Sequence, residues 1–377
     1  MEPSLLHPFV VQAVSKEGDD VGTCETGNDY DGRVGLRVSS IFVILAGSLL
    51  ATLLPLLVKR FGERGAHRQV AFADAEGEGQ RTGGEGRGRT VWPLLLFISR
   101  YFGSGIIIAT AFIHLLAPAE EALRNECLTG VIAEYCWVEG IILMTIVIMF
   151  MVEFSAMRYT LPGEGIPAKS GNEQGKNHYR IGEEEGVLSS DDLNDRYHLS
   201  AAEKDRPGSD YTAQLIGLFI LEFGIIFHSI FIGLTLAVAG GSEFTTLYVV
   251  LFFHQTFEGL GLGSRLAKIP WPAASRMKRW TPYILAIAYS ATTPIAIAIG
   301  LAVRTTYPPS GRTTLIVTGV FDSISAGILM YTGLVELLAH EFIFGGEMHR
   351  APLRTVWSAF ALLCLGSGLM ALLGRWA

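Results

Sequence analysis

Two neighbouring apolar stretches of the chain contain ionisable side chains. The stretch LEFGIIFHSIFIGLTL carries Glu222 and His228, and the stretch FFHQTFEGLGLGSRL carries His254 and Glu258. Helical residues four positions apart share one face, so His254 and Glu258 are expected to point in the same direction. A charged group at the centre of a membrane helix costs about 2.5–3.5 kcal/mol even on permissive insertion scales. Such residues in apolar helices therefore indicate a functional site.

The spacing of the two stretches predicts that their polar residues meet. They belong to apolar spans at residues 211–240 and 244–266, and only residues 241–243 separate these spans, which makes the two helices adjacent and antiparallel. His228 lies 14 residues before Ser242, whereas His254 and Glu258 lie 12 and 16 residues after it. At about 1.5 Å of rise per residue, His228 and Glu258 lie roughly 20–25 Å from the turn, with His254 close to the level of His228. We expect two imidazoles and a carboxylate to converge at this depth.

This set of donors predicts a metal site. Two histidines and a glutamate suit zinc, and they also suit iron, cobalt or manganese. Ser229 and Gln255 follow the two histidines directly and could add oxygen ligands or hydrogen bonds around the ion. The alternative is that these side chains only join helices through hydrogen bonds. Three ionisable residues at one depth favour the metal site.

The elements that must carry these residues are membrane helices. Hydrophobic residues make up 50% of the 377 residues, and charged residues make up 17%, against about 25% in a globular domain. Eight stretches reach the roughly 20 apolar residues that a spanning helix needs. They cover residues 38–58, 92–118, 137–157, 211–240, 244–266, 283–303, 313–338 and 356–376. The predicted fold class is an all-α integral membrane protein with eight transmembrane helices.

The distribution of Lys and Arg predicts the orientation of these helices. The alternate loops 59–89, 158–206, 265–279 and 350–354 hold about 21 of the 29 basic residues. That side is expected to be cytoplasmic, so both termini are expected to be extracellular or lumenal. No basic region followed by an apolar one precedes residue 38, so we expect no cleavable signal peptide.

Polar residues nearer the helix ends extend the predicted site into a pathway with an entrance and an exit. Its members are His114, Glu120, Glu222, Glu336, His340 and Glu341. A solvated helix end or a satisfied hydrogen bond is the alternative for each of them. In the external loop, an oxidising environment allows Cys127 to pair with Cys136, with Cys24 as a rival partner.

These stretches resemble the ZIP family of zinc–iron permeases, particularly its fungal and plant branch. The resemblance rests on FHSIFIGLTL and HQTFEGLGLG in the central pair, and on ATAFIHLLAPA, SATTPIAIAIG and LMYTGLVELLAHEF elsewhere. It extends over all eight helices and the segment CETGNDYDGRVGLRVSSIFVI. It implies a three–two–three arrangement in which helices one to three and six to eight form inverted repeats and the central pair holds the metal. It also implies metal movement towards the cytoplasm by an elevator-like shift of the site-bearing helices.

The resemblance also assigns roles to positions of this chain. It implies a metal centre at His228, Ser229, His254, Gln255 and Glu258, an outer entrance at His114 and Glu120, and an inner exit at Glu336, His340 and Glu341. Two departures are present. Family members with a two-metal centre carry a carboxylate where this chain has Ile232 and a glutamate near the position of Thr293. We therefore expect one main metal site.

Together these observations predict a transporter of zinc, or of another divalent metal, that moves its ion into the cytoplasm and is not an enzyme. The transported ion is expected to be Zn²⁺, with Fe²⁺, Mn²⁺, Co²⁺ and Cd²⁺ as alternatives. The other expected partner is the lipid bilayer, and a homodimer is a further alternative. The absence of a basic block argues against nucleic acid as a partner. The plasma membrane is the expected location, with an internal membrane as the alternative.

Two other classes of protein were weighed against the transporter. A metal sensor that does not transport is disfavoured because the loop between the third and fourth helices holds only His178 and His198. An intramembrane metallohydrolase is disfavoured because the HExxH pattern that begins at His340 has Phe344 in place of its second histidine.

The expected organisation has five parts. They are an external segment at residues 1–37, helices one to three at 38–158, a disordered cytoplasmic loop at 159–210, the central helix pair at 211–266 and helices six to eight at 267–377.

Overall fold

The computed structural model describes residues 24–28, 30–75, 91–160, 207–271, 276–344 and 346–376. Residues 1–23 of the predicted external segment and residues 161–206 of the predicted cytoplasmic loop lie outside the described residues. Within the described part of the chain, all regular structure is helical.

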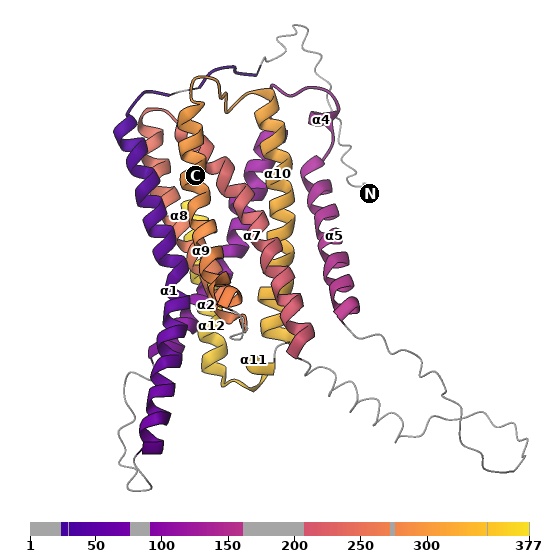
Figure 1. Cartoon of the computed structure of the whole chain (residues 1–377). Helices are drawn as coiled ribbons and strands as arrows, with labels where there is room; N and C mark the ends of the chain where they lie inside the picture. The colour runs from indigo at the N-terminus through magenta and orange to yellow at the C-terminus, as the bar shows by residue number, and fades with distance from the viewer. Residues whose placement is uncertain are drawn as a thin grey trace, which may run out of the picture.

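The long helices run side by side and form one bundle (Figure 1). They are α1 (Val34–Ala75), α2 (Val91–Ala109), α5 (Trp137–Thr160), α7 (Pro207–Val238), α8 (Gly241–Lys268), α9 (Arg276–Ala302), α10 (Arg312–Tyr331) and α12 (Leu353–Leu373). Shorter helices are α3 (Ala117–Leu123), α4 (Val131–Glu134) and α11 (Gly346–Arg350), and two π-helical segments are η1 (Thr110–Leu116) and η2 (Thr332–Phe344). The segment η1 joins α2 directly to α3, and η2 continues α10.

Seven helical segments of the described chain are long and apolar enough to cross a membrane. The all-α membrane class predicted from the sequence is therefore confirmed. The helix α8 is not among the seven, because it carries His254, Gln255 and Glu258 among other polar residues. These three side chains are at most 1% exposed, since α8 packs against α1, α2, α9 and α12. The polar face of α8 is thus buried against its neighbouring helices.

The long helices form two groups. One consists of α1, α7, α8 and α9, and the other consists of α2, α5, α10 and α12. Where α2 meets α8, the two backbones approach closely, because a Cβ atom on Gly103 would lie 2.5 Å from the Cα atom of Gly261. Only glycine permits such an approach. The groups are therefore in direct backbone contact at this point.

A buried arginine organises one end of the bundle. The guanidinium of Arg37 donates to the carbonyl oxygens of Leu236, Ala237 and Ala239 at 3.2, 2.9 and 2.6 Å, and so caps the carboxyl end of α7. Its hydrogen bond to Asp31, at 2.8 Å, lowers the pKa of that carboxyl. We call this end, which carries the α7–α8 turn, the outer end, and the opposite end the inner end, following the predicted topology.

The predicted pairing of Cys127 with Cys136 is wrong. Cys127 forms a disulfide with Cys24, with 4.9 Å between their Cα atoms, and Cys136 is a free, exposed thiol. The reason is the path of the segment before α1. Asn28 donates to the carbonyl oxygens of Arg304 and Tyr307, at 2.6 and 2.8 Å, which fixes the segment across the outer end. This path brings Cys24 to Cys127.

Candidate metal centre

His228 on α7 meets His254 and Glu258 of α8 inside the bundle. One ligand atom from each residue lies within 4.8 Å of the other two. His254 Nε2 and Glu258 Oε1 are 3.2 Å apart, and the two imidazole centroids are 5.5 Å apart. All three residues are at most 3% exposed. The four-residue spacing on α8 and the short α7–α8 turn produce the convergence that the sequence predicts.

Many polar side-chain atoms of this cluster lack a hydrogen-bond partner in the described part of the chain. Eight side-chain atoms of His228, Ser229, His254, Gln255 and Glu258 are buried without a hydrogen-bond partner of good geometry among the described residues. Buried polar atoms are normally paired, because an unpaired one costs about 1–3 kcal/mol. Their concentration in five adjacent side chains indicates a built ligand site. Ser229 and Gln255, at 1% and 0% exposure, belong to the same buried layer.

The cluster fits a small divalent ion. Tetrahedral zinc with bonds of about 2.0–2.1 Å holds its donors about 3.4 Å apart. The observed separations, up to 4.8 Å, must then close by about 1.4 Å at most. Side-chain torsions can supply that contraction without displacement of a helix. Neutral imidazoles with a carboxylate also provide negative charge, which a divalent cation compensates.

A cavity of about 200 Å³ lies on the outer side of the centre, and His114, His228, His254 and Asp322 line part of its wall. The ring of His114 stands perpendicular to that of His254, with centroids 4.6 Å apart. His114 Nε2 lies 2.9 Å from the carbonyl oxygen of Met370. A carbonyl oxygen only accepts, so Nε2 donates and Nδ1 of the neutral ring keeps a lone pair. His114 therefore lies beside the candidate metal centre, with the lone pair of its neutral ring on Nδ1.

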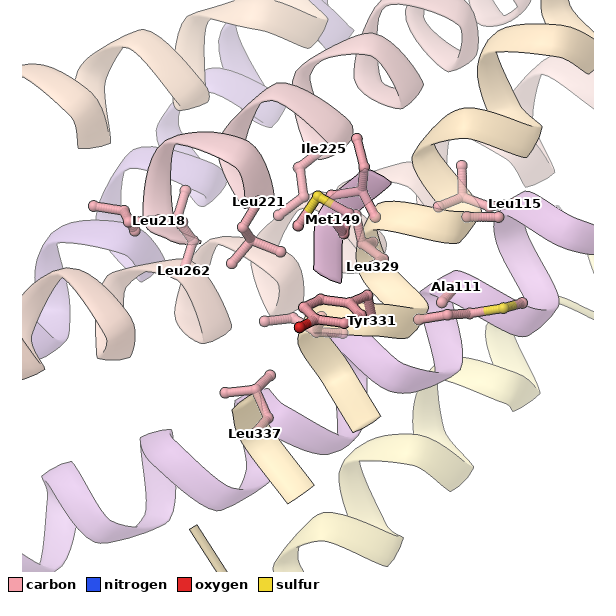
Figure 2. Packing of buried hydrophobic residues seen from close by; sticks show 14 of the residues in the cluster. Ala111, Leu115, Met149, Leu218, Leu221, Ile225, Leu262, Leu329, Tyr331 and Leu337 are labelled. Carbon is pink, nitrogen blue, oxygen red and sulfur yellow. The ribbon is translucent and has the colours of Figure 1, made fainter. Parts of the chain in front are cut away.

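An apolar layer lies on the inner side of the centre. Ile225 precedes His228 by one helical turn, and Leu262 follows Glu258 by one turn; both are at most 1% exposed. They belong to one apolar cluster with Leu221, Leu329 and Tyr331, whose side chains come from several helices and pack together in Figure 2. This layer separates the candidate metal centre from the inner end.

A second cavity, of about 140 Å³, lies beyond the apolar layer and is lined by charged residues. Glu341 accepts from Arg100 Nε and Lys268 Nζ, each at 2.8 Å. Glu336 forms an ion pair with Arg265. The structure therefore brings the acidic residues of the predicted exit into one cavity, but each is already paired with a basic side chain.

The remaining predicted pathway residues lie apart from the centre. Glu120 forms an ion pair of 2.8 Å with Arg124, in the same helical turn. Glu222 is 5% exposed, six residues before His228 on α7, and it lines neither the outer nor the inner cavity. His340 lines the inner cavity.

Two features of the site were not predicted from the sequence. The first is the contact of Asp322 with His228, with 3.5 Å between Asp322 Oδ1 and His228 Nδ1; a carboxylate inside an apolar helix was the available signal. The second is the π-helical backbone, because His114 falls in η1 and the three predicted exit residues fall in η2. π-Helical turns occur frequently at functional sites, but no sequence pattern marked these two.

The fold and the buried cluster define a class: a multi-pass helical membrane protein that encloses side chains able to hold a metal ion. Residues 34–374 match the family described as ZIP zinc transporter. The chain belongs to this family, as its sequence motifs predict, and is therefore a transporter and not an enzyme.

Its relatives include proteins from yeast and a plant. Zinc-regulated transporter 1 of Saccharomyces cerevisiae is 36% identical, over 98% of this chain and 96% of that protein. Zinc-regulated transporter 2 of the same yeast is 35% identical, over 95% of this chain and 98% of that protein. Zinc transporter 3 of Arabidopsis thaliana is 29% identical, over 99% of this chain and 96% of that protein.

Proposed function

We propose that this protein carries zinc into the cytoplasm through the centre formed by His228, His254 and Glu258. The observation that supports this most directly is the buried cluster of ligand atoms within 4.8 Å of one another. Ser229 and Gln255 complete the coordination or hold it in place by hydrogen bonds. The names of the relatives, all zinc transporters, support zinc as the cargo.

The two cavities support alternating access to this centre. The outer cavity reaches His228 and His254 directly, whereas the apolar layer stands between the centre and the inner cavity. In this arrangement an ion enters from the outer side and cannot leave on the inner side. Delivery to the cytoplasm then requires a rearrangement of the two helix groups that opens the apolar layer.

The proposed topology has eight spans, with α8 as the span whose polar face is buried inside the bundle. Helices are arranged three–two–three as inverted repeats, and both termini face the exterior. The distribution of basic residues supports this orientation, and the exposed apolar side chains of α5, such as Leu143, Met144 and Ile148, support contact with lipid. The plasma membrane is the proposed location. A homodimer is a prediction that follows from the sequence alone.

One main metal site is proposed. Ile232, at the position of a second-site carboxylate in the two-metal members of the family, lines the outer cavity and has no donor atom. Iron and manganese are the alternative cargoes, because the same nitrogen and oxygen donors bind them. Selectivity among these ions therefore depends on the coordination geometry of the site, and it is measured by competition between the ions for uptake.

The test is uptake of radioactive zinc by metal-starved cells that express the protein at a matched surface level. The variant His254→Ala, Glu258→Ala is expected to lose saturable uptake. The matched control is Glu243→Ala, His349→Ala, which removes the same two residue types at exposed positions and is expected to retain it. Iron and manganese are added as competitors, and the order in which they inhibit zinc uptake ranks the ions by preference. Uptake by the wild type no greater than in cells that lack the protein would refute the proposal.

A further inference from the structure

Asp322 is a buried carboxylate that the proposed transport route does not yet use. It lies in α10 and is 3% exposed, and its Oδ1 atom has no hydrogen-bond partner of good geometry among the described residues. The described residues show no basic side chain paired with it; its ionisable neighbour is His228, with 3.5 Å between Asp322 Oδ1 and His228 Nδ1. Both residues line the outer cavity. The position of Asp322 therefore indicates a role that involves this histidine.

The chemistry of imidazole defines that role. A histidine that binds a metal through one ring nitrogen generally donates the N–H of the other to a carboxylate or carbonyl group. A carboxylate only accepts, so an approach of Asp322 to Nδ1 selects the tautomer with the proton on Nδ1. The lone pair of His228 is then on Nε2. We propose that Asp322 is a positioning residue that holds His228 in the tautomer and ring orientation needed to bind the ion through Nε2. The inference rests on the proposed transport of zinc through this centre.

The contact also joins the two helix groups. His228 lies on α7, in the group with α1, α8 and α9, whereas Asp322 lies on α10, in the group with α2, α5 and α12. A relative displacement of the groups by a few ångströms separates the two side chains. The support from Asp322 is then lost, and the centre binds its ion more weakly than in the arrangement that is open to the outer cavity. A ligand shifts an equilibrium only through such a difference in affinity between states.

The predicted effect is on affinity rather than on maximal rate. Loss of a carboxylate that orients a ligating histidine typically weakens metal binding about 10–100-fold. We expect Asp322→Ala to raise the zinc concentration for half-maximal uptake at least about tenfold, with the maximal rate within about twofold of the wild type. Asp322→Asn keeps an oxygen that accepts from Nδ1, so its loss should be smaller, about threefold. The control is Ser323→Ala, which removes a neighbouring buried hydroxyl that donates to the Gly319 carbonyl of its own helix, at 2.6 Å.

The experiment measures the kinetics of zinc uptake in cells and the zinc affinity of the purified full-length protein for the wild type and these variants. In a His228→Ala background, Asp322→Ala should change the zinc affinity by less than about twofold, because its target is absent. The positioning role is overturned if Asp322→Ala leaves the zinc concentration for half-maximal uptake unchanged. It is also overturned if Asp322→Ala lowers the zinc affinity equally in the presence and in the absence of His228. If the wild type itself takes up no zinc, the proposed transport fails, and the affinities of the purified variants still decide the role of Asp322.

Discussion

The inner cavity allows a quantitative prediction about the release of the ion. Its wall holds Arg100, Arg265 and Lys268 together with Glu153, Glu336 and Glu341, three basic and three acidic side chains. The substitution Glu341→Gln removes one negative charge while Arg100 and Lys268, each 2.8 Å from that carboxylate, remain. The cavity then carries an uncompensated positive charge that an outgoing cation must pass.

The size of this effect follows from the dimensions of the cavity. A sphere of about 140 Å³ is about 6 Å across, and a divalent ion about 6 Å from a unit positive charge is repelled by about 1.4 kcal/mol in bulk water. The repulsion reaches about 5.5 kcal/mol at an effective dielectric constant of 20. Even the lower value corresponds to about a tenfold slower passage. We expect Glu341→Gln to lower the maximal rate of zinc uptake at least about tenfold, without a change in half-saturation.

A second substitution separates charge from loss of a ligand. Glu341→Gln combined with Lys268→Gln restores the balance of charges in the cavity, and we expect the maximal rate to return to within about threefold of the wild type. The assay is the initial rate of radioactive zinc uptake at saturating zinc, normalised to surface protein. Glu121→Gln, an exposed acidic residue near the outer end, serves as the control. A double variant as slow as the single one would show that the reasoning from charge is wrong.

Three further predictions concern stability and covalent structure. Gly103→Ala should lower the midpoint of thermal unfolding in detergent, because its Cβ would lie 2.5 Å from the α8 backbone, whereas Gly368→Ala, with open space around its Cβ, should not; equal midpoints would contradict the close helix contact. Asp31→Asn should destabilise the protein at pH 6, and this difference should shrink as the pH falls below about 3.8. The buried arginine of α1 lowers the pKa of the Asp31 carboxyl, so its contribution is complete above the unfolded pKa and is lost as the pH falls through the lower pKa of the folded state; a difference that does not decrease below pH 3.8 would contradict this. Cys24→Ser should abolish the disulfide and Cys136→Ser should leave it intact, as judged by mass spectrometry of unreduced peptides; the reverse pattern would restore the pairing expected from the sequence.

Local patterns explain why much of the centre could be predicted. The spacing of His254 and Glu258 fixes their shared helix face, and the short turn before α8 fixes their depth relative to His228. Both relations involve residues that are close in the sequence or joined by one tight turn. The apolar stretches likewise predicted the helices, because the length of a membrane span follows from the thickness of the bilayer.

Contacts between distant segments could not be predicted in this way. Asp322 and His228 are joined only by the packing of α10 on α7, and the ion pair of Arg100 with Glu341 spans 241 positions of the chain. The Cys24 disulfide depends on how a loop segment crosses the outer end. In each case the local pattern gives the type of residue, and the partner is chosen by the tertiary arrangement.

The centre and the inner cavity differ in how far their acidic side chains are already paired, and this difference bears on the direction of ion movement. At the centre, side-chain atoms of His228, His254 and Glu258 have no hydrogen-bond partner of good geometry among the described residues, so in the proposed transport an ion gains their full interaction when it binds. In the inner cavity, Glu336 and Glu341 are already compensated by basic side chains, so an ion that arrives there must compete with a tethered cation. The carboxylates of this cavity offset the positive charge of the passing ion, but they hold the ion weakly. In the proposed transport, opening of the apolar layer lets the ion pass from a strong site to weak ones, and water at the inner end completes its release.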